Sequence, residues 1–81
     1  MQVRVRLAGR LAGVFGAPQL VVDLPQGATV ADLLADLAGR APGAGPALAG
    51  ALPVVAGTHA AREDVLTGGQ ELALLLPVSG G

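Results

Sequence analysis

Side chains that could catalyse a reaction or bind a metal are few and scattered in this 81-residue sequence, which has one histidine and no cysteine. His59 has no second histidine or cysteine at metal-ligand spacing, so we predict neither a metal site nor a general base there. Two carboxylate pairs, Glu63–Asp64 and Asp32/Asp36, are expected in a loop and on a helix surface. A hydrolytic carboxylate pair also needs a cleft, for which one small domain is too short. The sequence therefore predicts that the chain is not an enzyme by itself.

Composition argues against two further classes of function. The net charge is −1 and the five basic residues are all arginine, too few for a nucleic-acid-binding surface. Every apolar run is interrupted by glycine, proline or charge before it reaches the roughly 20 residues of a membrane span. The first residues, Met-Gln-Val-Arg-Val-Arg, lack the apolar stretch of a signal peptide. We therefore expect a cytoplasmic protein that binds neither nucleic acid nor membrane.

The remaining candidate group is a backbone carboxylate, at the end of the run Pro77, Val78, Ser79, Gly80 and Gly81. Proline ends a strand because it has no N–H, so residues 77–81 are expected to form a flexible tail. Glycine has no Cβ, so such a tail could enter a narrow channel of another protein and present the Gly81 carboxylate. The alternative is that the two terminal glycines reflect composition alone, since the sequence has 13 glycines and a second Gly-Gly pair at 68–69.

The elements that would hold this tail are predicted from residue periodicity. Apolar and polar residues alternate over residues 2–7, which indicates a half-buried strand, and a second strand is predicted over 19–24. The glycine-rich stretch 8–18 between them is predicted to be a loop, so the two strands should form an antiparallel hairpin.

A helix and a third strand are predicted next. Thr29 and Asp32 have the spacing of a capping box at the start of a helix, which Gly39 and Pro42 should end. Residues 41–50 have no periodicity and are predicted to be a loop with at most a brief helical turn. Residues 51–56 are a plausible strand, in which Pro53 favours an edge or a late start.

The last predicted strand, residues 70–76, is apolar on both faces, which is typical of a central strand. One face carries Leu72, Leu74 and Leu76, and the other Ala73 and Leu75. A single helix covers only one face of a small sheet, so the face with Leu75 is either a partner surface or is covered by a loop.

The order strand, strand, helix, strand, strand, with the last strand parallel to the first, predicts an α+β fold. It is the β-grasp, or ubiquitin-like, arrangement: a mixed four- to five-stranded sheet with one main helix over residues 1–76.

Four segments together make the sequence resemble the MoaD/ThiS family of sulfur-carrier proteins, nearest to the small subunits of molybdopterin synthase. They are Leu-Pro-Val-Ser-Gly-Gly at 76–81, Leu-Thr-Gly-Gly-Gln-Glu-Leu at 66–72, Ala-Thr-Val-Ala-Asp-Leu-Leu at 28–34, and Val-Arg-Val-Arg-Leu-Ala-Gly-Arg-Leu at 3–11. The family commonly has a bulky aromatic residue at the position of Ala8 and asparagine at that of Ala56.

The resemblance implies that a ubiquitin-activating-type enzyme adenylates the Gly81 carboxylate with ATP and magnesium, and that sulfur from a persulfide then replaces AMP. The product is a C-terminal thiocarboxylate, a strong nucleophile near neutral pH. In the molybdopterin branch the tail enters the large subunit of molybdopterin synthase, and no cofactor is bound by the carrier itself. Leu75, Ala8 and His59 are the expected partner contacts; otherwise His59 is a solvated loop residue.

Other destinations for the sulfur stay open: thiamine, cysteine, thiolated tRNA or a secondary metabolite. A ubiquitin-like modifier would instead join Gly81 to a lysine of a target protein. A third alternative is a β-grasp binding module with an inert tail.

Overall fold

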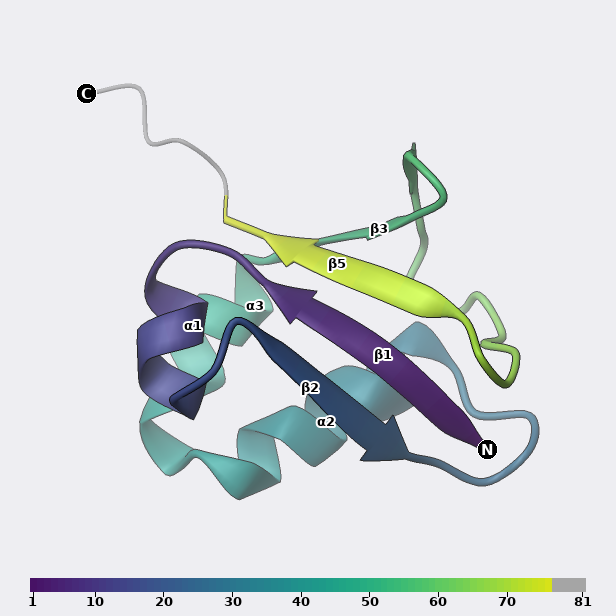
Figure 1. Cartoon of the computed structure of the whole chain (residues 1–81), viewed down its shortest axis with the longest axis horizontal. Coiled ribbons are helices and arrows are strands. Elements are labelled where there is room, and N and C mark those ends of the chain that lie inside the picture. The colour runs from purple at the N-terminus through teal and green to yellow at the C-terminus, as the bar shows by residue number, and fades with distance from the viewer. Residues whose placement is uncertain (77–81) are drawn as a thin grey trace.

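The computed structural model describes residues 1–76, and the predicted tail, residues 77–81, lies outside them. The described residues form five strands and four helical segments (Figure 1), in the order β1 (Gln2–Leu7), α1 (Arg10–Phe15), β2 (Gln19–Asp23), α2 (Val30–Arg40), η1 (Pro42–Ala44), α3 (Gly45–Ala49), β3 (Leu52–Val55), β4 (Thr58–His59) and β5 (Glu71–Leu75).

All five strands belong to one mixed sheet with the order β2-β1-β5-β3-β4. β1 pairs antiparallel with β2 and parallel with β5, and β5 pairs antiparallel with β3. The last strand therefore lies at the centre, beside the first, although about 65 residues of chain separate them in sequence. The predicted hairpin, the parallel pairing and the β-grasp fold are confirmed.

The main helix, α2, packs on one face of this sheet because its apolar residues repeat at helical spacing. It buries Val30, Leu33, Leu34 and Leu37. The predicted capping box is present: the Asp32 N–H donates to Thr29 Oγ1 at 3.3 Å, and the Thr29 N–H donates to Asp32 Oδ2 at 2.9 Å. The helix runs through Gly39 and ends at Arg40. Of the two predicted end signals, Pro42 therefore ends the helix, because the residue before a proline is driven out of helical geometry.

Two shorter helical segments differ from prediction. The stretch 8–18 is not all loop: α1 forms within it, and its Leu11 is fully buried in the core. Burial of one leucine and a left-handed Gly16 cap stabilise a six-residue turn that sequence periodicity is too short to reveal. The segment 41–50 contains η1 and α3, so the brief helical turn is confirmed and is longer than expected.

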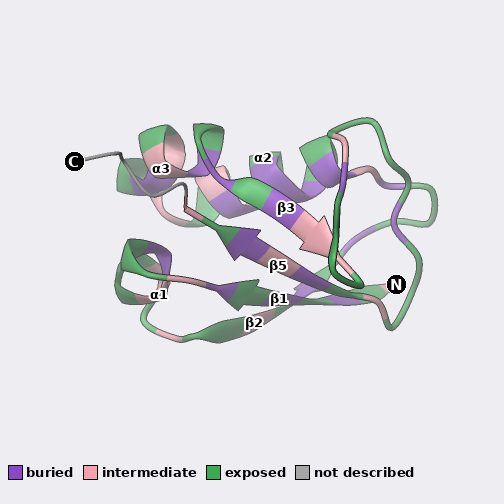
Figure 2. Cartoon of the chain, turned by 90° about the horizontal axis from the view of Figure 1, so that it is seen from above, coloured by how far each residue is buried: buried purple, intermediate pink, exposed green. Residues whose placement is uncertain are grey.

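The opposite face of the sheet is the outer face, and helices α2 and α3 both lie away from it (Figure 2). Leu75, which points to the outer face, is 42% exposed. Within residues 1–76 no loop covers that side chain. Of the two alternatives for this face, the prediction that a loop covers it is therefore wrong.

Candidate functional site

The strand register gathers one set of side chains on the outer face. Paired residues on neighbouring strands point to the same side of a sheet, and Arg6 pairs with Gln19 on β2 and with Ala73 on β5. Ala73 pairs in turn with Val54 on β3. The outer face is mainly polar over β2 and β1, apart from the exposed Val21, and the polar part includes Glu71 at the start of β5. Beside it, β5 and β3 carry an apolar patch of four residues: Leu52, Val54, Ala73 and Leu75.

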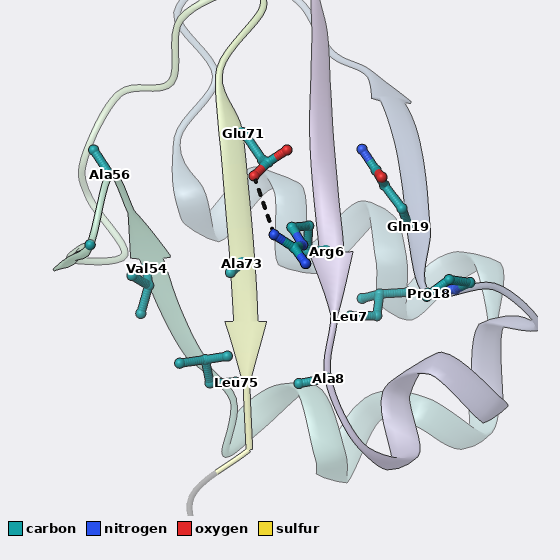
Figure 3. Close-up of a pocket in the computed structure, with 11 residues that line it drawn as sticks. Arg6, Leu7, Ala8, Pro18, Gln19, Val54, Ala56, Glu71, Ala73 and Leu75 are labelled. Carbon is teal, nitrogen blue, oxygen red and sulfur yellow. Dashed lines mark ion pairs between the residues drawn. The ribbon is translucent and has the colours of Figure 1, made fainter.

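A groove of about 670 Å³ runs across the boundary between these two halves. Its apolar side is formed by Ala8, Ala73, Val54 and Leu75, and its polar side by Arg6, Gln19 and Glu71 (Figure 3). The groove is open because the residues along its middle, Ala8 and Ala73, are small. Such a hollow, apolar on one side and charged on the other, can receive a protruding side chain from another protein.

The charges at the groove are available to a partner. Arg6 Nη1 lies 3.9 Å from Glu71 Oε1, and both side chains are well exposed, at 67% and 44% (Figure 3). An exposed ion pair at this distance contributes about 0–1 kcal/mol to stability. Either charge can therefore exchange this contact for one with a docking protein at little cost.

The end of β5 lies at the rim of the groove. The Ala8 N–H donates to the Leu74 carbonyl oxygen at 3.2 Å, so the ladder between β1 and β5 continues to the point where both strands end. Leu75 lines the groove, and Leu76 is partly buried on the core side. The five predicted tail residues, Pro77, Val78, Ser79, Gly80 and Gly81, follow at once but lie outside the described residues, so no geometry is assigned to them.

The model of one protein family, ThiS, matches residues 5–81 of the sequence. The chain belongs to the ThiS family. This confirms the resemblance recognised in the sequence. No curated protein matches the chain significantly.

Solved structures extend the comparison of this ThiS-family chain. SAMP1 from Haloferax volcanii is 31% identical with a TM-score of 0.86, and the match covers 100% of both chains. A putative molybdopterin converting factor, subunit 1, from Pyrococcus furiosus is 22% identical with a TM-score of 0.87, over 96% of this chain and 99% of that one. Subunit 1 and 2 of a molybdopterin-converting factor from Helicobacter pylori form a complex, one chain of which is 20% identical with a TM-score of 0.69 over 100% of both chains. The last two show the shared fold.

The three predicted contact residues of this ThiS-family chain lie on one face, but not in one site. Ala8 and Leu75 both line the groove. His59 is exposed on the short edge strand β4, paired with Val54, so it faces the same side but stands outside the groove lining. Sequence reasoning missed Leu52 and Val54, because residues 52–55, Leu-Pro-Val-Val, are all apolar and their pattern does not show which side chains face outward.

Three of the four carboxylates set aside in the sequence have structural contacts. Asp32 caps α2, Asp36 Oδ2 accepts from Arg40 Nε at 2.8 Å, and Asp64 Oδ2 accepts from the Ala61 N–H at 2.9 Å. Among residues 1–76, no three His, Cys, Asp or Glu side chains gather closely enough to hold a metal ion. No helix in this part of the chain has the length and apolarity needed to cross a membrane.

Proposed function

We propose that this ThiS-family chain is a sulfur carrier in which the carboxylate of Gly81 is the reacting group. The observation that carries the proposal is the position of the groove: its Leu75 lies six residues before Gly81, at the end of the central strand. A protein that docks on the groove is therefore within reach of the end of the sequence. The family match, which extends to residue 81, supports the same reading.

The chemistry takes place in partner enzymes, since a carboxylate is a poor electrophile. An adenylating enzyme with ATP and magnesium lets a Gly81 oxygen attack the α-phosphorus, and pyrophosphate leaves. The terminal sulfur of a persulfide then attacks the acyl carbon, and AMP leaves. A thiol cleaves the resulting S–S bond and becomes a disulfide, which releases the thiocarboxylate.

The acceptor of the sulfur is proposed to be the large subunit of molybdopterin synthase. The fold likeness to one chain of the Helicobacter pylori complex supports a two-subunit arrangement. A carrier serving thiamine, cysteine, tRNA thiolation or a secondary metabolite would use the same activated Gly81 with another acceptor.

A ubiquitin-like modifier is the second candidate. The 31% identity to SAMP1, a small archaeal modifier protein, over the full length of both chains favours it. In this case a lysine amine of a target protein would attack the activated Gly81 and form an amide. The sequence has no lysine of its own, so side-chain conjugation of one copy to another is excluded.

The test is reconstitution with the adenylating enzyme of the same organism, ATP, magnesium and a persulfide donor, followed by intact-mass measurement. The sulfur carrier is expected to gain one sulfur in place of one oxygen on the C-terminal residue. Deletion of Gly81 should abolish AMP release while the thermal unfolding curve stays unchanged, because the core residues of β5, Leu72 and Leu74, are retained.

The same reaction distinguishes the two candidates. With a lysine-bearing target protein added to the mixture, lysine-linked conjugates and no thiocarboxylate would favour the modifier. AMP release that is unchanged in the deletion variant would contradict both, because each requires the Gly81 carboxylate.

A further inference from the structure

The turn that follows β1 holds the end of β5 from the side. After the Ala8 to Leu74 hydrogen bond, Gly9 turns the chain with φ 57° and ψ −130°. This backbone conformation is open to glycine and strained for residues with a Cβ. Helix α1 starts at the next residue and buries Leu11, which attaches the turn to the core.

Leu76 packs directly against this turn. Its Cδ1 atom lies 3.5 Å from the position that a Cβ atom on residue 9 would occupy. The Leu76 side chain is partly buried against the core, whereas Leu75 is exposed on the outer face. The last two residues before Pro77 thus have different surroundings: Leu75 faces the groove, and Leu76 attaches the chain to the body of the domain.

We infer that Leu76 is a positioning residue. By packing on Gly9 it fixes the point from which the residues after it extend, and so sets how far the Gly81 carboxylate can reach toward a partner docked on the groove. This inference rests on the proposed function. Each residue that detached from the domain would add about 3.3–3.6 Å of slack to that reach. A misplacement of roughly 1 Å at a reacting group can lower a rate by up to ~100-fold.

Substitutions of the neighbouring residues Leu75 and Leu76 are expected to have opposite kinetic effects. Replacing Leu76 leaves the groove intact, so docking is retained. The position of the Gly81 carboxylate in the partner's site then varies more widely. Replacing Leu75 removes part of the docking face while the attachment at Leu76 is retained. A role of Leu76 in folding alone would change stability but neither kinetic constant of the folded protein.

The experiment measures ATP-dependent AMP release by the adenylating enzyme with the full chain and a persulfide donor as substrates, for wild type, Leu76→Ala, Leu76→Met and Leu75→Ala. Leu76→Ala is expected to lower kcat about tenfold with little change in KM. Leu75→Ala should raise KM and leave kcat near the wild-type value. Leu76→Met, whose long side chain can still reach Gly9, should restore most of the lost kcat.

Hydrogen exchange at the Ala8 amide is a second readout that needs no enzyme. Its exchange should be faster in Leu76→Ala, because the turn loses its packing partner, and unchanged in Leu75→Ala. A Leu76→Ala variant with lower thermal stability but wild-type kcat would overturn the positioning role and leave the proposed function standing. Wild-type protein that releases no AMP would overturn both.

Discussion

At the scale of single residues, Ala56 is under backbone strain. Val55 pairs with Thr58, which leaves Ala56 and Gly57 as a two-residue hairpin loop, with φ values of 52° and 79°. Positive φ at both positions is the type I′ turn, which favours asparagine followed by glycine. An alanine in this conformation costs roughly 1 kcal/mol.

Ala56→Asn is therefore expected to raise the free energy of unfolding by about 0.5–1 kcal/mol. Chemical denaturation measures the change. The matched control is Ala35→Asn on the exposed face of α2, which should lower stability by roughly 0.5 kcal/mol because asparagine is the poorer helix former. Equal effects of the two substitutions would show that the turn conformation is not the cause.

At the scale of elements, the long helix was predictable and the short ones were not. The apolar spacing and capping box of α2 extend over 11 residues, so several local signals agree. In α1, Leu11 is the one buried residue among six, and six residues are too few for a helical periodicity to show in the sequence. Its helical form depends on the core that receives Leu11.

Thr29→Ala tests the capping box of α2. The substitution removes the acceptor of the Asp32 N–H, so the free energy of unfolding should fall by about 1 kcal/mol. Denaturant unfolding gives the value. Thr67→Ala, at an exposed position before β5, is the control and should change stability by less than about 0.5 kcal/mol. A Thr29→Ala variant as stable as this control would contradict the capping role.

At the scale of the whole molecule, the groove is made by residues that are distant in sequence. Ala8 follows β1, Ala73 lies on β5 and Val54 lies on β3, and the parallel and antiparallel pairings bring them together. The small side chains of Ala8 and Ala73 leave the space of the groove open, and Leu75 forms its rim. The proposed partner docks on this surface, so substitutions on the outer face should change binding without changing stability.

Leu75→Arg is expected to raise KM for the adenylating enzyme about tenfold, because a charge replaces an apolar contact in the docking face. The melting temperature should stay nearly constant, since the side chain is already 42% exposed. Val14→Arg, at a position of similar exposure on α1 outside the groove lining, is the matched control and should leave KM unchanged. A large loss of stability in Leu75→Arg would place Leu75 in the core instead.

The sequence by itself determined the features that depend on near neighbours: the alternation that makes β1, the apolar faces of β5, the cap of α2, and Gly-Gly as its last two residues. Only the tertiary structure decided the groove, the exposure of Leu75 and the contact between Gly9 and Leu76. The groove and the exposure of Leu75 depend on strand register, and the contact between Gly9 and Leu76 depends on packing between segments more than 60 positions apart. No local spacing records which distant residue a side chain will meet.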